Sequence, residues 1–200
     1  MYLKALLRGI KITLIFLGVL CLFSFPAPAF FKNNQVISNL IYIASEIPAV
    51  LVTMWFVSKH YDIRIKDHIS FRNIKLFTIL AWIILGASSL IVLDELTTVI
   101  WVDVFHTVNA VSNGTDSRSM ISTVILCTGN VLIIPVAEEL GFRVCCLESI
   151  KQKSNAVFAA IISSAFFGIV HLGGWRTILS DALSGIILAV AYLITQNLVY

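Results

Sequence analysis

Long apolar runs separated by short polar connections dominate the pattern of the chain. Six of these runs approach or reach the ~20 residues that a helix needs to cross a bilayer. They extend over about Ile10 to Phe31, Val36 to Ser58, Leu76 to Leu93, Met120 to Leu147, Ala156 to Leu172 and Ile178 to Val199. The pattern therefore predicts an all-α, polytopic membrane protein with about six transmembrane helices.

The composition supports this fold class and removes others. Apolar residues make up 58% of the 200 residues and charged residues only 12%, and the mean hydropathy is +0.94. Soluble domains carry about 25% charged residues, so this chain lacks the polar surface to cover a globule in water. The same figures exclude a disordered protein, a disulfide-rich secreted scaffold and a nucleic-acid binder with a basic surface. We expect the lipid bilayer to be its main partner.

The positions of the charges predict how the helices are oriented. Basic residues gather before the first run, at Lys4, Arg8 and Lys11, and in the connection 59–75, which carries five of them. The connection 94–119 is acidic. Because cytoplasmic loops carry the excess of Lys and Arg, both termini are predicted to be cytoplasmic. By analogy, the short chain is typical of a multi-pass protein of a bacterial plasma membrane.

The first 29 residues also resemble a signal peptide. A basic segment precedes the apolar stretch Ile12–Phe25, and Ala27-Pro28-Ala29 supplies small residues at a cleavage position. Cleavage would leave an odd number of helices. A first helix that is kept in the mature protein agrees better with the even number of predicted transmembrane helices.

Ionisable residues inside apolar runs are costly, so each is a candidate functional residue. Glu46 lies two residues before Pro48 and could line a cavity, although a structural role is the simpler interpretation. Asp181 follows Ser180 near the start of the last run, where either side chain could cap the helix. The remaining candidates are Glu138, Glu139, Arg143 and His171.

Glu138 and Glu139 form an adjacent acidic pair within the fourth apolar run. Glu139 and Arg143 are four residues apart, in the order that favours an ion pair on one helix face. That pair leaves Glu138 without a counter-charge in its own helix. A carboxyl group in such surroundings suits a general base that activates water, while a buried salt bridge beside one neutral glutamate is the structural alternative.

The spacing along the chain also connects Glu138 with His171. The polar turn at Ser154-Asn155 lies about 16 residues from both of them. In an antiparallel pair of helices both side chains would then lie ~24 Å from the turn, at one depth. A carboxylate and an imidazole at one level could hold a water molecule between them. Gly168 and the serines at 163 and 164 would allow the neighbouring helices to approach closely.

These residues resemble a known family. Glu138-Glu139-x-x-x-Arg143, followed by Phe167-x-x-x-His171, is similar to the first two motifs of the CPBP intramembrane proteases, also called Abi, a family of CAAX prenyl endopeptidases and bacteriocin-processing and self-immunity proteins. The resemblance implies a protease core over residues 120–200, after an N-terminal membrane region of about three helices at 1–119. It implies that Glu138 and His171 activate the hydrolytic water, that Glu139 and Arg143 hold the helix, and that Phe167 packs beside the site at the substrate pocket.

The resemblance is incomplete in one respect. A third family motif, His-x-x-x-Asn or His-x-x-x-Asp, is expected beyond residue 200, and no histidine follows His171. We therefore expect a chain truncated before that motif. The resemblance makes zinc possible, but a catalytic zinc needs about three protein ligands, this chain supplies too few, and the cofactor stays unknown.

Three functions remain open from the sequence. The first is an intramembrane endopeptidase acting on a peptide or protein substrate, such as a prenylated CAAX tail, a bacteriocin leader or a membrane-anchored regulator. The second is a catalytically impaired membrane protein that acts in bacteriocin self-immunity or as a regulatory partner. The third is a transporter or channel subunit that uses Glu46 and Glu138 as a proton relay. The sequence gives no oligomeric state.

Overall fold

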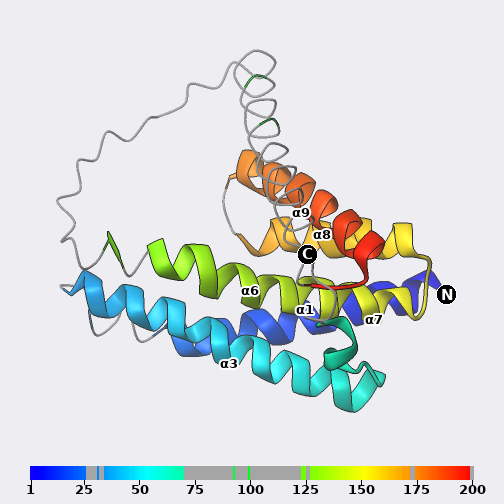
Figure 1. Ribbon diagram of the computed structural model, residues 1–200, viewed down its shortest axis with the longest axis horizontal. Helices are drawn as coiled ribbons and strands as arrows, with labels where there is room; N and C mark the ends of the chain where they lie inside the picture. Colours follow the sequence, from blue (N-terminus) through cyan, green and yellow to red (C-terminus); the bar gives the residue numbers. More distant parts are fainter. Residues whose placement is uncertain are drawn as a thin grey trace.

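The computed structural model describes residues 1–25, 31, 34–69, 92, 99, 123–124, 127–171 and 174–198. Within these residues the chain forms helices and connections, without a strand. Figure 1 shows the helices packed as one bundle, with α8 and α9 crossing on one side of it. The predicted all-α class is confirmed.

Helices α1 (Tyr2–Ser24) and α3 (Gln35–Tyr61) pack along each other. Phe25 follows α1 with right-handed helical dihedral angles, and its backbone N–H donates to the carbonyl of Cys21 at 2.9 Å. Asn34 starts α3, because its side chain accepts a hydrogen bond from the backbone N–H of Ile37 at 3.1 Å. Asp62 ends α3 in the left-handed conformation, with φ of 52°. The short 3₁₀ helix η1 (Ile65–His68) follows.

The third helical run extends from Gly129 to Lys151 and contains two π-helical segments. It consists of η3 (Gly129–Ile133), α6 (Ile134–Glu139), η4 (Leu140–Leu147) and α7 (Glu148–Lys151). The segments η3 and η4 are π-helical, a form that is rare and found frequently at functional sites. Every side chain of η4 after Leu140 is buried, so this run forms the centre of the bundle.

Helices α8 (Ala156–Val170) and α9 (Trp175–Thr195) pack tightly because small residues meet where they cross. A Cβ atom on Gly168 would collide with the backbone carbonyl of Ile178 and lie 2.9 Å from the Cβ of Ala182. A Cβ on Gly185 would lie 3.1 Å from the Cβ of Ser164. The predicted close approach through Gly168 and the serines is therefore confirmed, with the glycines as the closest points.

Three of the described helices are long and apolar enough to cross a membrane: Tyr2–Ser24, Val36–Tyr61 and Trp175–Thr195. Helix α8 is apolar but shorter. The predicted run from Leu76 to Leu93 and the acidic connection 94–119 lie almost wholly outside the described residues. The count of about six spans is therefore not confirmed and stays a prediction.

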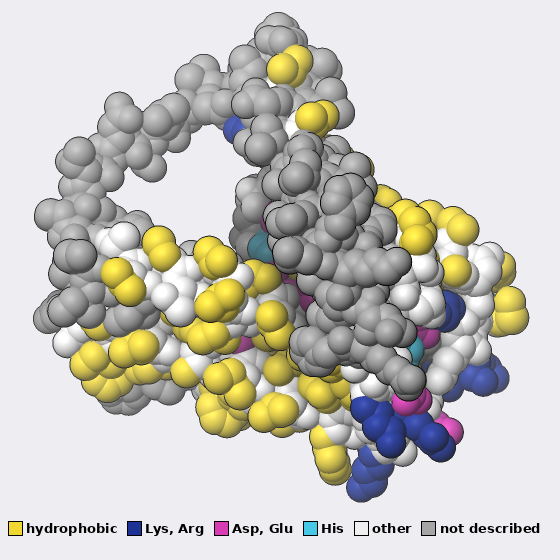
Figure 2. Space-filling view, in the orientation of Figure 1, with side chains coloured by type: hydrophobic (Ala, Val, Ile, Leu, Met, Phe, Trp, Pro, Cys, Tyr) yellow, Lys and Arg dark blue, Asp and Glu magenta, His cyan; other side chains and the backbone are white. Residues whose placement is uncertain are grey.

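The first helix differs from its prediction, because it starts at Tyr2 instead of Ile10. Its basic residues therefore lie within the helix, and Arg8 has partners at one end of the bundle. The Arg8 guanidinium lies 4.4 Å from the ring centroid of Tyr61, and its Nη1 donates to Gln152 Oε1 at 2.9 Å. Figure 2 shows Lys and Arg side chains gathered at one end, while hydrophobic side chains cover much of the surface in view.

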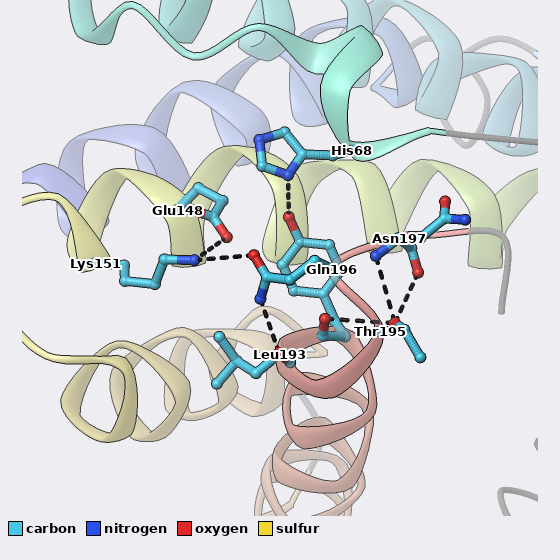
Figure 3. A network of polar contacts seen from close by, with 8 residues as sticks. His68, Glu148, Lys151, Leu193, Thr195, Gln196 and Asn197 are labelled. Carbon is cyan, nitrogen blue, oxygen red and sulfur yellow. Dashed lines mark hydrogen bonds and ion pairs between the residues drawn. The ribbon is translucent and has the colours of Figure 1, made fainter.

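A polar network joins α7, α9 and η1, as Figure 3 shows. We define the polar network as His68, Glu148, Lys151, Tyr192 and Gln196. The Tyr192 hydroxyl lies 2.7 Å from His68 Nδ1, and Lys151 Nζ lies 2.6 Å from Glu148 Oε1 and 3.5 Å from Gln196 Oε1. The backbone N–H of Leu198 also donates to the carbonyl of His68 at 2.9 Å. These contacts connect the end of α9 to η1 and α7.

Candidate active site

The acidic pair lies where α6 passes into η4. Glu139 Oε1 lies 3.2 Å from Arg143 Nη2, as the four-residue spacing predicts. The Arg143 side chain is 0% exposed, and its guanidinium lies 5.0 Å from the ring centroid of Phe167. No nitrogen of this guanidinium makes a hydrogen bond within the described structure. Glu139 and the face of one aromatic ring are therefore what compensates a fully buried cation.

Glu138 meets His171 across the interface between α6 and the end of α8. Glu138 Oε1 lies 3.6 Å from His171 Nε2, and the two side chains are 21% and 30% exposed. The equal spacing from the turn at Ser154-Asn155 predicted this proximity, and the structure brings the two groups together. Their catalytic role stays a prediction.

A backbone carbonyl determines which nitrogen of His171 carries a proton. His171 Nδ1 lies 2.8 Å from the carbonyl oxygen of Phe167. A carbonyl oxygen only accepts hydrogen bonds, so Nδ1 is the donor in this contact. In the neutral ring Nε2 is then left with its lone pair directed toward Glu138.

Asp181 belongs to this site, and the prediction that it caps the last helix is wrong. Helix α9 begins at Trp175 after Gly174, which makes no side-chain cap, so Asp181 lies two turns inside the helix. Its Oδ2 lies 3.7 Å from His171 Nδ1 and has no hydrogen-bond partner in the described structure. The imidazole therefore lies between two carboxyl groups, Glu138 on one side and Asp181 on the other.

The periodicity of α9 could have indicated this position. Gly185, Ala189 and Tyr192 are the buried residues of the helix and recur at helical spacing. Asp181 continues that series one turn toward the N-terminus. A carboxyl group on the face that packs into the bundle is a stronger signal for a site than its place near a helix end.

A cavity of about 290 Å³ opens beside Glu138 and His171. Helix α3 contributes Glu46 and Tyr42 to its wall. The other lining residues are Phe16, Leu17, Leu20, Cys21, Ser24, Phe142 and Val170. Glu46 therefore lines a cavity. The sequence allowed this interpretation beside the simpler one of a purely structural role.

Phe167 lies beside the site and is not among the residues that line this cavity. Its ring packs edge-on against Phe142 and His171, with centroids 5.3 and 4.8 Å apart. The guanidinium of Arg143 lies over the same ring. This agrees with the expectation that Phe167 packs beside the site, whereas its contact with a substrate stays a prediction.

The described residues contain no group of three or more His, Cys, Asp and Glu side chains placed to hold a metal ion. The residues around His171 thus do not fit the ligand set of a catalytic zinc. The groups present are two carboxyl groups on the cavity wall, one imidazole and the carboxyl group of Asp181 behind it.

Comparison with known protein families matches residues 120–200 to the type II CAAX prenyl endopeptidase Rce1-like family. The family resemblance inferred from the two motifs at 138–143 and 167–171 is confirmed over this part of the chain. The role in bacteriocin self-immunity stays a prediction. Comparison with curated proteins gives no match, and neither does comparison with solved structures.

Proposed function

We propose that this chain is an intramembrane endopeptidase in which Glu138 and His171 activate the water that attacks a peptide bond. The match of residues 120–200 to a CAAX prenyl endopeptidase family supports a peptidase. The observation that carries the catalytic assignment is the 3.6 Å distance between Glu138 Oε1 and His171 Nε2 on the wall of one cavity.

The two groups act together on one water molecule. Both Glu138 Oε1 and His171 Nε2 are acceptors, so a water bound beside them donates one hydrogen to each. Its lone pair is then directed away from the wall, toward a carbonyl carbon held in the cavity. Glu138 takes the proton as the water attacks, and the imidazole keeps the water oriented. Positioned general bases contribute about 10²–10⁴-fold to a rate.

The surrounding residues hold this pair in place. Arg143 binds Glu139 in the next position of the helix, which fixes the face that carries Glu138. The Phe167 carbonyl fixes the tautomer of His171, and Asp181 Oδ2 lies 3.7 Å from the same Nδ1. The apolar wall from α1 and Phe142 would exclude bulk water from the reacting groups.

We further propose a multi-pass arrangement in which the basic end of the bundle faces the cytoplasm. Arg8 contacts Tyr61 and Gln152, which adjoin each other, and Lys59 and Lys151 are within two residues of these partners in the chain. Cytoplasmic ends of membrane helices carry the excess of basic residues. The substrate would then be a membrane-associated polypeptide, and the family match makes a prenylated CAAX peptide the first one to use.

The test is peptide hydrolysis by the purified full chain in liposomes, with a fluorescence-quenched prenylated CAAX peptide as the probe. We expect Glu138→Gln and His171→Ala each to lower the rate by about 10²–10⁴-fold. Glu148→Gln and His68→Ala are matched controls, because they change the same residue types within the polar network and away from the cavity. Cleavage that survives both site variants would refute the assignment.

A further inference from the structure

Glu46 is a second acid on the wall of the cavity, and it comes from a part of the chain outside the family match. The residue is 2% exposed, and its Oε2 has no hydrogen-bond partner within the described structure. It lines the same cavity as Glu138 and His171. On α3 it lies on the same buried face as Val50, Thr53 and Val57, so the fold holds a carboxyl group where it would otherwise place an apolar side chain.

The buried cation beside the cavity is already paired with another carboxyl group. Arg143 pairs with Glu139, and His171 lies between Glu138 and Asp181. Among the described residues Glu46 has no ion-pair partner. A buried carboxyl group without a cation or donor is much more stable as the neutral acid than as the anion. Glu138, whose side chain is 21% exposed and can meet water, is the better place for a negative charge.

We propose that Glu46 is the general acid of the reaction, which donates its proton to the nitrogen of the departing amine. The inference rests on the proposed peptidase function and adds a catalytic residue from α3 to it. A peptide held with its carbonyl carbon near the water of Glu138 has its nitrogen within the same cavity, which Glu46 also lines. Amines are poor leaving groups as anions, so the C–N bond breaks readily only when the nitrogen gains a proton.

The protons and bonds balance over one turnover. The water oxygen bonds to the carbonyl carbon, and its first proton passes to the Glu138 carboxylate. The C–N bond then breaks, and the nitrogen takes the proton of the Glu46 carboxyl group, which becomes a carboxylate. The second proton of the water stays with the new carboxyl product. After release, the proton on Glu138 passes to Glu46 across the cavity, and both groups return to their starting states.

The geometry offers other donors, and the test must separate them from Glu46. Tyr42 also lines the cavity, and Glu138 itself carries a proton after the attack. A role for Glu46 in positioning alone would slow every substrate equally. A general acid, by contrast, matters only for a leaving group that needs a proton.

The experiment compares two forms of the same prenylated CAAX peptide, one with the scissile amide and one with a thioester in its place. A thiolate leaves without a proton, because a thiol has an ordinary pKa of about 8.5. Full-length Glu46→Gln and Glu46→Asp are assayed in liposomes beside the unmodified chain. Thr53→Val is the control, because Thr53 is a buried polar residue on the same face of α3 and does not line the cavity.

We expect Glu46→Gln to lower amide hydrolysis by about 10²–10⁴-fold and to change thioester hydrolysis little. Glu46→Asp, which keeps the acid, should recover part of the amide rate. The ratio of the two rates is measured on one preparation, so a smaller fraction of folded protein cancels from it. Equal losses on both substrates, or no loss on either, would overturn the proposal.

The same experiment distinguishes this inference from the proposed function. If Glu138→Gln abolishes hydrolysis of both substrates while Glu46→Gln leaves the ratio unchanged, the peptidase assignment stands and Glu46 is not the acid. If the unmodified chain cleaves neither substrate, the peptidase assignment fails and the role of Glu46 fails with it.

Discussion

The polar network and the surroundings of the cavity contain similar polar residue types, but they differ in whether the polar atoms have hydrogen-bond partners. In the polar network His68, Glu148, Lys151 and Tyr192 find partners at 2.6–2.7 Å. Around the cavity, Arg143 and Glu46 keep buried polar atoms without hydrogen bonds. Buried polar groups are normally satisfied, so each exception needs an explanation. The hydroxyls of Thr13 and Ser164 also lack partners in the described structure, but the unsatisfied ionisable groups, Glu46, Arg143 and Asp181, lie at or beside the place where we propose the chemistry.

The largest expected effect comes from breaking the most deeply buried ion pair. Arg143→Ala leaves Glu139 without its cation, and we expect it to lower the free energy of unfolding by about 3–5 kcal/mol. Chemical unfolding in detergent micelles measures the change. Replacing both partners, with Glu139→Gln and Arg143→Met, should cost far less, because no charge is then left unpaired. Equal losses in the single and double variants would contradict this account.

An intermediate loss of stability is expected from a change at Gly168, where α8 and α9 approach each other closely. Gly168→Ala places a methyl group against the Ile178 carbonyl, and overpacking of this kind costs about 1–3 kcal/mol of stability. Gly18→Ala on α1 is the control, because nothing lies within 4 Å of its added Cβ. That substitution should instead leave α1 unchanged or stabilise it by up to ~1 kcal/mol through helix propensity. Thermal unfolding of both variants makes the comparison, and equal shifts would refute tight packing at Gly168.

The smallest effect is expected in the polar network. Tyr192→Phe removes the hydroxyl that contacts His68, and one such hydrogen bond is worth about 0.5–1.5 kcal/mol. Peptide hydrolysis per folded molecule should not change, because the residue lies outside the cavity. The same preparation gives both values, from an unfolding curve and a rate. A fall in the rate with unchanged stability would show that the two regions are coupled.

The sequence predicts those parts of the site that depend on local spacing. Glu139 and Arg143 pair because they are four residues apart, and Glu138 meets His171 because each lies about 16 residues from one turn. The sequence indicates Glu46 as a candidate, but its spacing does not place it beside Glu138, because its neighbours in the cavity come from helices distant in the sequence. Asp181 was misplaced because the apolar run suggested a start at Ile178, whereas α9 begins at Trp175. The π-helical turns left no signal in the apolar pattern.

The π-helical segment η4, between Glu139 and Glu148, has a consequence for how the chain tolerates changes in length. A π turn contains more residues than an α turn over the same length of helix axis. Segment η4 therefore has more residues beside the site than an α-helix of the same length would have. Deleting one residue there would let the segment tighten to α-helix while Glu139 and Glu148 keep their faces. A deletion in regular α8 has no such reserve and would turn His171 by about 100° away from Glu138. Length variants among natural relatives should therefore concentrate in η4.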